Sequence, residues 1–355
     1  MQAIAEQFQE TIRAASAARA PLTIRGGGSK DWYGNGAAST TVLDTRAYTG
    51  IVAYEPTELV ITARCGTPLA EIEALLARHG QMLAFEPPRF GSGSTIGGVV
   101  ATALSGPRRA SAGAVRDFML GARLIDGHGE HLRFGGQVMK NVAGYDVARL
   151  LAGSLGTLGL ITEVSIKVLP LPLREASLRF ELGEIEALAR LNEWAGQPLP
   201  ISASCWHDGV LSVRLSGAEA AVTAAQRKLG GAAFGGAARD DASFWTSLRD
   251  QSHAYFDGGD LWRLSVPPAA SAIILKGEQL IEWGGAQRWF KAAAADAQKI
   301  RGIAAAVGGH ATLFRGTAAS AAGAFHPLAP ALHKIHQRLR AQFDPSGIFN
   351  PGRMY

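Results

Sequence analysis

Arg25-Gly26-Gly27-Gly28-Ser29-Lys30 follows Leu22–Arg25, a short apolar segment that predicts a β-strand opened by Pro21. Three consecutive glycines expose successive backbone N–H groups with no Cβ in the way, and that geometry can bind an anion. The flanking basic residues and the serine hydroxyl add donors suited to a pyrophosphate. The spacing is not that of a Walker A loop, and no helix follows as a Rossmann fingerprint requires. The segment is therefore either a flexible turn or a phosphate-binding loop.

Three further glycine-rich segments lie in the same half of the chain. They are Gly91-Ser92-Gly93-Ser94-Thr95-Ile96-Gly97-Gly98, Gly113-Ala114-Val115-Arg116-Asp117 and Gly153-Ser154-Leu155-Gly156-Thr157-Leu158-Gly159. The first of them lets the backbone lie flat against a planar ligand and predicts a short helix over Val99–Leu104 with its N-terminus toward that ligand, although tight helix packing would also explain it. The last precedes an apolar strand, Leu160–Leu169. One such loop is weak evidence, but four together indicate one extended dinucleotide lying across a sheet.

The length and composition predict a globular protein of two domains, or of one large domain with a cap. The chain has 355 residues, 47% of them hydrophobic, and a domain holds roughly 150 residues. Pro170-Leu171-Pro172 is the predicted boundary. A helix is expected at each end, over Ala3–Arg19 and Leu328–Phe343. Between the boundary and the last helix, the pattern predicts two split βαβ units around an antiparallel sheet, with a Gly/Ala-rich linker and two further helices. These three segments are Gly230–Ala238, Ala242–Tyr255 and a stretch after Pro268.

The composition also excludes several classes of protein. Cys65 and Cys205 are the two cysteines, too few for a disulfide framework or an iron–sulfur cluster, and a reducing compartment fits. No apolar run reaches the roughly 18 residues of a membrane span, and the first ten residues lack the apolar core of a secretory signal. The net charge of +5 is spread along the chain, so we expect an anionic ligand or partner and no nucleic acid.

These segments resemble the FAD-binding domain of the vanillyl-alcohol oxidase/p-cresol methylhydroxylase family. The ending Phe343-Asp344-Pro345 with Asn350-Pro351-Gly352 is similar to that of the family's 2-hydroxy-acid dehydrogenase branch. Within that branch, the chain is similar to the FAD-binding E subunits of bacterial glycolate oxidases (glycolate dehydrogenases). The segments that carry this second similarity are Lys140–Asp146, Leu261–Leu264 and Trp283–Trp289.

The resemblance implies an α+β fold with three parts. These are a two-subdomain FAD-binding domain of the vanillyl-alcohol oxidase type over residues 1–172, an antiparallel-sheet cap domain with split βαβ units over 173–327, and a C-terminal helix and tail over 328–355 that return to the FAD domain. Covalent members carry a histidine at the end of the first glycine loop. Ser29-Lys30 stand there in this chain, so the resemblance implies non-covalent FAD.

The resemblance also implies a role for each glycine segment. Gly26–Lys30 would bind the FAD pyrophosphate, Gly93–Gly98 would line the pyrophosphate and the flavin side, and Gly113–Asp117 and Gly156–Ile161 would hold the adenosine portion. Asn350 would lie near the flavin edge. The full predicted cofactor-binding set is Arg25, Gly26, Gly27, Gly28, Ser29, Lys30, Gly93, Thr95, Ile96, Gly97, Gly98, Gly113, Ala114, Arg116, Asp117, Gly156, Leu158, Gly159, Ile161 and Asn350.

The catalytic group is less well defined by the sequence. Catalytic hydroxy-acid oxidases of this branch carry a His-x-Gly-Asp-Gly-Asn-x-His motif, which is expected to supply metal ligands and a base for the hydroxyl proton. The matching stretch here keeps only His310, so no complete metal site is expected. Arg263 and Arg288 lie among tryptophans and could clamp a carboxylate, dock a partner or lie at the surface. These three residues are the weak catalytic candidates. The pairs Trp262–Arg263 and Arg288–Trp289 are the candidates for docking.

By this resemblance the chain is an accessory or electron-relaying subunit of a complex that oxidises glycolate to glyoxylate. Its partners would be a sister FAD-binding catalytic subunit and an iron–sulfur subunit, in the cytoplasm or peripherally at the inner face of the cytoplasmic membrane. Two alternatives stay open. One is a self-sufficient FAD-dependent alcohol or 2-hydroxy-acid oxidase or dehydrogenase, and the other is a non-enzymatic assembly scaffold that retains the fold.

Overall fold

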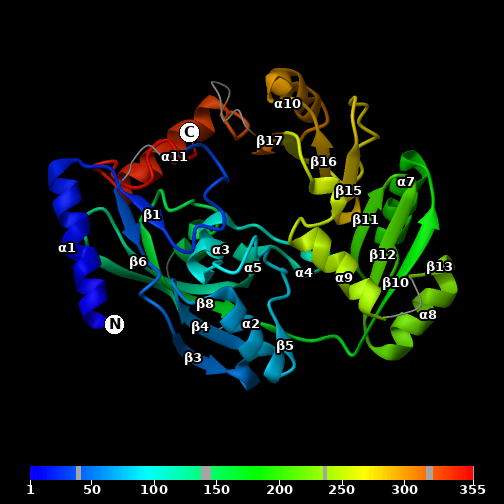
Figure 1. Ribbon diagram of the computed structural model, residues 1–355, viewed down its shortest axis with the longest axis horizontal. Helices are drawn as coiled ribbons and strands as arrows, with labels where there is room; N and C mark the ends of the chain where they lie inside the picture. The colour runs from blue at the N-terminus through cyan, green and yellow to red at the C-terminus, as the bar shows by residue number, and fades with distance from the viewer. Residues whose placement is uncertain (37–40, 137–144, 235–237, 317–322, 355) are drawn as a thin grey trace. The chain divides into compact units, whose positions relative to one another are not determined.

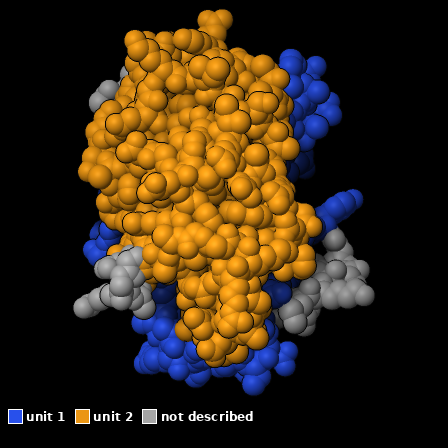
Figure 2. All heavy atoms as spheres, turned by 90° about the vertical axis from the view of Figure 1, so that its right-hand side faces the viewer, with its two compact units in different colours: residues 1–104, 114–170, 327–355 blue, residues 105–113, 171–326 orange. Residues whose placement is uncertain are grey.

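The chain forms two compact units, described here from a computed structural model (Figure 1). The first unit contains residues 1–104, 114–170 and 327–355, and the second contains residues 105–113 and 171–326 (Figure 2). The structure describes residues 1–36, 41–136, 145–234, 238–316 and 323–354. Most of the Lys140–Asp146 segment therefore lies outside the described residues.

A five-stranded antiparallel sheet of order β3-β4-β8-β6-β7 lies at the centre of the first unit. Its middle strand, β8 (Leu160–Lys167), is buried along most of its length, as its apolar sequence requires. Helix α1 (Gln2–Ala18) places Phe8 and Ile12 in one core cluster with Ile125 and Leu160 of the sheet. The other strands are β3 (Ile51–Glu55), β4 (Val60–Arg64), β6 (Met119–Ile125) and β7 (His131–Gly135).

A second, smaller sheet carries the first glycine loop. Strands β1 (Thr23–Arg25) and β2 (Val42–Asp44) pair in parallel, and Leu22 forms a parallel bridge with Phe349 of the C-terminal tail. Leu22 and Phe349 are buried in the cluster that contains α1. The tail therefore lies directly beside the strand that ends in the glycines.

The remaining elements of the first unit are short apart from two helices. They are η1 (Pro56–Glu58), α2 (Leu69–Arg78), β5 (Gln81–Met82), α3 (Ile96–Thr102), α5 (Val115–Phe118), α6 (Val147–Leu151), β9 (Leu169–Pro170) and α11 (Pro330–Phe343). Helix α3 packs against β4 and β8, which places the glycines of its first turn over the central sheet.

An eight-stranded antiparallel sheet forms the second unit, in the order β13-β10-β12-β11-β15-β16-β14-β17. Its strands are β10 (Arg174–Glu181), β11 (Ile201–His207), β12 (Val210–Gly217), β13 (Ala232–Ala233), β14 (Leu261–Ser265), β15 (Gln279–Glu282), β16 (Gln287–Lys291) and β17 (His310–Arg315). The other elements are α4 (Arg109–Ala112), α7 (Glu184–Ala195), α8 (Glu219–Leu229), α9 (Ala238–Arg249), η2 (Ala254–Phe256), η3 (Trp283–Gly285), η4 (Ala294–Asp296) and α10 (Ala297–Ala306).

This sheet consists of two four-stranded repeats with equivalent strand order, of which the first is a complete βαββαβ unit and the second lacks the helix between its first two strands. In the first repeat, α7 connects β10 to β11 and the two strands lie on either side of β12; in the second, β14 and β15 lie on either side of β16. The repeats meet where β11 pairs with β15. The α+β class and the two split βαβ units are therefore confirmed.

Three predicted elements of the second unit differ from the structure, one of them only in its bounds. No helix follows Pro268, because the carbonyls of Ala270 and Ser271 accept hydrogen bonds from the Arg288 guanidinium instead of from helical N–H groups. The helix expected over Ala242–Tyr255 ends at Arg249, just before Gln251 at a φ of +53°. Part of the predicted Gly230–Ala238 linker is strand β13, which pairs with β10, while residues 235–237 lie outside the described residues.

Candidate functional site

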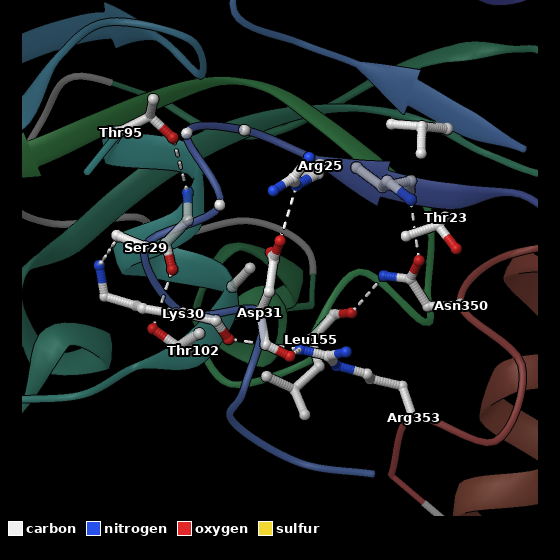
Figure 3. A pocket seen from close by; sticks show the side chains of 17 residues that line it. Thr23, Arg25, Ser29, Lys30, Asp31, Thr95, Thr102, Leu155, Asn350 and Arg353 are labelled. Carbon is white, nitrogen blue, oxygen red and sulfur yellow. Dashed lines mark hydrogen bonds and ion pairs between the residues drawn. The ribbon is translucent and has the colours of Figure 1, made fainter. Parts of the chain in front are cut away.

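A pocket of about 320 Å³ opens at the end of β1 in the first unit (Figure 3). The first glycine loop forms one wall, and α3, the start of the Gly153–Gly159 segment and the C-terminal tail contribute the others. Its lining residues are Thr23, Ile24, Arg25, Gly26, Gly27, Gly28, Ser29, Lys30, Asp31, Val42, Thr95, Gly98, Ala101, Thr102, Leu155, Asn350 and Arg353. The predicted pyrophosphate loop is thus the principal element of the pocket.

The first two glycine segments pack backbone against backbone. A Cβ built on Gly27 would lie 1.4 Å from the carbonyl oxygen of Gly93, and one on Gly26 would lie 2.5 Å from Oγ1 of Thr95. Gly28 has a φ of +75°, which L side chains rarely adopt. Each of the three glycines therefore has a separate steric reason, and together they form a cradle of exposed backbone.

Basic side chains dominate the charge of this pocket. Arg25 pairs with Asp31, with 2.7 Å between Nε and Oδ2, and Nζ of the buried Lys30 donates to Oγ of Ser94 at 2.7 Å. Arg353 donates from Nη2 to the backbone carbonyl of Asp31 at 2.7 Å. Asp31 is the one acidic residue among the described lining residues, so the three basic side chains favour a ligand with more than one negative charge.

Asn350 connects the loop segments at the base of the pocket. Its Oδ1 accepts a hydrogen bond from the backbone N–H of Ile24 at 2.8 Å, and its Nδ2 donates to the carbonyl of Leu155 at 2.6 Å. Figure 3 shows both bonds. The side chain therefore holds β1 at a fixed distance from the Gly153–Gly159 segment.

A smaller pocket of about 70 Å³ adjoins the first and shares several of its residues. It is lined by Ile24, Gly26, Thr45, Cys65, Gly97, Gly98, Ala101, Leu155, Gly156, Gly159, Leu160, Ile161 and Asn350. Burial raises the pKa of the Cys65 thiol to about 12, against a hydrogen bond with Thr45 that lowers it. Cys65 is therefore a neutral wall residue at physiological pH.

These two pockets bring three of the four glycine segments together. The third segment lines neither of the two pockets. Its Gly113 belongs to the second unit. Asp117 accepts a hydrogen bond from the backbone N–H of Ala114 through Oδ2. Arg116 pairs at 3.7 Å with Asp117. The other predicted residues outside both linings are Gly93, Ile96 and Leu158. Gly93 nevertheless supports the cradle through Gly27.

The residues fit a dinucleotide cofactor, because a glycine cradle and three cations meet beside a pocket walled by backbone. An FAD binding domain family model matches residues 3–135. Over all 355 residues, the chain is 51% identical to glycolate oxidase subunit GlcE of Escherichia coli (strain K12), covering 100% of this chain and 97% of that protein.

The chain belongs to the GlcE family of glycolate oxidase subunits.

Other matches extend beyond the GlcE family. Glycolate oxidase subunit GlcD of Bacillus subtilis (strain 168) is 29% identical over 187 residues, which are 52% of this chain and 39% of that protein. Among solved structures, an alkyldihydroxyacetonephosphate synthase matches with a TM-score of 0.69 at 17% identity, covering 98% of this chain and 74% of that one. The predicted flavoprotein fold is confirmed for this GlcE family member.

One of the three catalytic candidates, Arg288, is a structural residue in this GlcE family member. Arg288 is completely buried, and its guanidinium donates to the carbonyls of Ala270, Ser271 and Gly285. The expectation that the pairs Trp262–Arg263 and Arg288–Trp289 dock a partner is wrong for the tryptophans as well, because Trp262 and Trp289 are 0% and 3% exposed. Their indoles donate to the carbonyl of Ala292 and to the carboxylate of Glu282.

The other two candidates, Arg263 and His310, lie on strands β14 and β17. Arg263 lies over the ring of Phe314, at 5.1 Å from its centroid. The ring of His310 lies 6.5 Å from that of His326. Within the described ranges, no three His, Cys, Asp or Glu residues form a group able to hold a metal ion. No helix among the described residues is both long enough and apolar enough to cross a bilayer.

Arg353 lines the large pocket but is not among the residues predicted from the sequence. Its guanidinium donates to the carbonyls of Lys30 and Asp31, and burial lowers its pKa against the opposing charge of Asp31. The residue directly follows the tail motif Asn350-Pro351-Gly352, so the signal was present. It could not be used because only folding brings the tail beside the glycine loop.

Proposed function

We propose that this chain binds one FAD non-covalently as a subunit of a complex that oxidises glycolate to glyoxylate. The observation that carries the proposal is the cradle of Gly26, Gly27 and Gly28 beside Arg25, Lys30 and Arg353, in a chain whose whole length is similar to a glycolate oxidase subunit. The first unit would form the FAD-binding domain, predicted over residues 1–172 and 328–355, and the second would form the cap, predicted over residues 173–327, except that residues 105–113 belong to the second unit.

The described side chains support a specific division of the site. The backbone of Gly26–Ser29 and the cations of the large pocket would hold the pyrophosphate. A pyrophosphate is bound well by two or more positive charges together with several N–H donors. The residues Gly97, Gly98, Gly156, Gly159, Leu160 and Ile161 line the adjoining pocket and would contact the rest of the dinucleotide through backbone. The third segment, with Gly113, Ala114, Arg116 and Asp117, would contact the adenosine portion, and Asn350 would position the loops on which the flavin edge rests.

The chemistry of the pocket walls supports non-covalent binding of FAD. Ser29 and Lys30 stand where covalent relatives carry a histidine, and Lys30 is held by Ser94. Among the residues that line the two described pockets there is no histidine or tyrosine, and the Cys65 thiol is neutral. No activated nucleophile therefore lines either of these two described pockets.

Bound FAD supplies a two-electron acceptor at this site. Oxidation of an alcohol also requires a group that accepts the hydroxyl proton. In the described part of the cap, His310 lacks the acid, amide and second histidine of the catalytic motif. We therefore assign proton abstraction and hydride transfer from glycolate to a sister FAD-binding catalytic subunit, and further electron transfer to an iron–sulfur subunit. This chain would serve as an accessory or relay subunit, with any membrane association arising through the complex.

Anaerobic titration with glycolate tests this assignment. The purified chain, loaded with FAD, should keep its oxidised flavin spectrum for many minutes, because a positioned base contributes about 100- to 10,000-fold. The assembled complex should bleach within seconds. Rapid bleaching of the isolated chain would instead establish a self-sufficient oxidase. The freshly purified native complex could also contain no more flavin than the sister subunit accounts for. That result would leave only the scaffold alternative.

Denaturation tests the non-covalent link separately. Precipitating the isolated FAD-loaded chain with acid should release all yellow colour to the supernatant, and the chain mass should match the sequence alone. Colour retained on the pellet, with a mass increase equal to FAD, would contradict the proposal.

A further inference from the structure

Helix α11 (Pro330–Phe343) has an amphipathic sequence but no buried residue. Leu332, Ile335, Leu339 and Phe343 recur at helical spacing and form one apolar stripe. Isolated helices of about this length are marginal in water, and most gain their stability by packing such a stripe. The sequence of α11 therefore fits a helix that is covered by something.

The two halves of the stripe differ in exposure. Leu339 and Phe343 are half-buried, and the Phe343 ring lies 6.2 Å from that of Phe134 on β7. Leu332 is 44% exposed and Ile335 is 60% exposed. The C-terminal half is therefore anchored to the first unit, while the N-terminal half presents two apolar side chains at an i, i+3 spacing. That spacing is typical of anchor residues in a helix that lies in a groove.

The charge of α11 defines the chemistry of the surface it would contact. Residues 330–343 include Lys334, Arg338 and Arg340 and no Asp or Glu. Arg340 is directed to the tail, where Nη2 donates to the carbonyl of Phe349 at 3.1 Å. Lys334 and Arg338 are exposed and lie one turn apart on the flank that adjoins Ile335. A complementary surface would therefore be apolar at its centre and acidic along one border.

We propose that α11 is a docking helix that inserts Leu332 and Ile335 into an apolar groove, bordered by Asp or Glu, on another subunit of the complex. This inference rests on the proposed function in so far as that function requires other subunits. A protein groove fits better than a lipid surface, because an interfacial helix buries a whole apolar face in the membrane, whereas Leu339 and Phe343 are already half-covered by the first unit. The proposed contact replaces the pairs Trp262–Arg263 and Arg288–Trp289, whose tryptophans are buried.

Reconstitution of the complex with a double variant tests the docking helix. The complete set of oxidase subunits is expressed together, with an affinity tag on this chain, and the composition is measured by light scattering and mass spectrometry. The double variant Leu332→Gln with Ile335→Gln should raise the dissociation constant for the other subunits by about 10- to 100-fold per substituted side chain. The free energy gained by burying one large apolar side chain corresponds to a factor of about this size, and glutamine would not gain it. Lys334→Glu with Arg338→Glu should also weaken assembly, and high salt should reduce the difference from wild type.

A matched control is Ile185→Gln, since Ile185 on α7 is 76% exposed. It should leave assembly unchanged. The FAD content and the melting temperature of each variant chain are also measured. Both should equal those of the wild type, because substitutions at exposed positions of α11 should not unfold the first unit. Full assembly of the folded Leu332/Ile335 variant would overturn the docking proposal while leaving the proposed function intact.

Vesicle flotation distinguishes a lipid surface from a subunit. Vesicles of phosphatidylethanolamine and phosphatidylglycerol are mixed with the isolated wild-type chain and with the double variant. If the wild-type chain floats, the variant does not, and both assemble equally well, α11 is a membrane contact and the docking proposal is wrong. Failure of the wild-type chain to assemble with any co-expressed subunit would instead contradict the proposed function itself.

Discussion

A side chain of any size at Gly27 would place its Cβ 1.4 Å from the carbonyl oxygen of Gly93. The two residues are far apart in sequence, and the clash is with backbone, which cannot rotate away as a side chain would. The pyrophosphate loop and the segment before α3 are therefore in direct contact at their backbones. The glycine at this position has a packing reason that does not depend on its own φ angle.

Gly27→Ala should therefore separate these two segments and abolish FAD retention. The methyl group forces a backbone shift, and overpacking of this kind costs about 1–3 kcal/mol or more. The melting temperature should fall by several degrees, and further through the loss of bound ligand. Differential scanning calorimetry and the flavin absorbance of the purified chain measure both effects.

Gly302→Ala is the control for that substitution. Gly302 is an exposed residue inside α10, and no atom lies within 4 Å of the Cβ it would gain. Alanine there should be neutral or raise stability by up to about 1 kcal/mol. Wild-type flavin content in Gly27→Ala would show that this loop does not hold the cofactor.

Asn350→Asp should weaken both the fold and FAD binding. Aspartate keeps the acceptor for the N–H of Ile24 and tolerates the φ of +39° at this position, but it cannot donate to the carbonyl of Leu155 when ionised. The loss should be about 1–3 kcal/mol, and the added negative charge in the pocket should reduce FAD affinity at least about 10-fold.

Comparison with Asn350→Ala separates the two effects. Alanine removes both hydrogen bonds and adds no charge, so it should lower stability by at least as much but reduce FAD affinity less. Chemical denaturation and fluorescence titration with FAD give the two quantities. An Asp variant that binds FAD as tightly as the Ala variant would show that Asn350 is remote from the phosphates.

Arg288→Met should destabilise the cap without acting on the cofactor site. Methionine fills much of the volume but leaves the carbonyls of Gly285, Ser271 and Ala270 without the guanidinium donor. Since each buried polar group left unsatisfied costs about 1–3 kcal/mol, the free energy of unfolding should fall by about 3 kcal/mol or more. The urea midpoint of the cap transition measures it.

Arg190→Met provides the comparison, because Arg190 on α7 is exposed and its ion pairs are 3.9 and 4.0 Å long. Surface pairs of this kind contribute about 0–1 kcal/mol. Equal effects of the two substitutions would contradict a structural role for Arg288.

The stability of the cap should decrease as the pH falls below about 6.5, in part through His253. Burial, and then the nearby His207, lower the pKa of His253, against the opposing charge of Asp257. The neutral Nδ1 accepts the backbone N–H of Tyr255 at 3.2 Å, and a protonated ring would lose that bond. Because the unfolded chain binds the proton more tightly, stability is fully present above the unfolded pKa of about 6.5 and is lost as the pH falls toward the folded pKa.

His253→Asn tests this dependence, since asparagine keeps an acceptor at the N-cap of η2. Melting temperatures from pH 8 to pH 5 should decline less steeply in the variant. The difference in slope should be at most about 1.4 kcal/mol per pH unit, which corresponds to one proton. Parallel curves for the two proteins would exclude His253 as a titrating group.

Much of the fold could be predicted because the information was local. The first helix was expected over Ala3–Arg19 and forms over Gln2–Ala18, because its apolar spacing and the capping geometry are properties of one segment. The same holds for the strand before the Gly26–Lys30 loop. Four glycine segments in one half of the chain indicated a dinucleotide site, because each needs a backbone conformation or a close approach that only glycine allows.

The features that were missed depend on residues distant in sequence. A helix after Pro268 was expected from local preference, but the Arg288 guanidinium takes the carbonyls that the helix would have used. Strand β13 forms within an apparent linker because β10 offers it a free edge. Arg353 joins the site only when the tail pairs beside β1. Tertiary contacts of this kind are not encoded in the periodicity of one segment.

The pairing of β11 with β15 makes the second unit comparable to a symmetric dimer contained in one polypeptide. Two identical chains that met in this way would have to accept every substitution in both copies at once. Fusion removes that constraint, so one repeat can diverge while the other preserves the sheet. The first repeat keeps helix α7, whereas the segment between β14 and β15 is irregular and is fixed by a buried arginine. The fused arrangement therefore gives the protein one half that keeps this helix and another that replaces it with a different local structure.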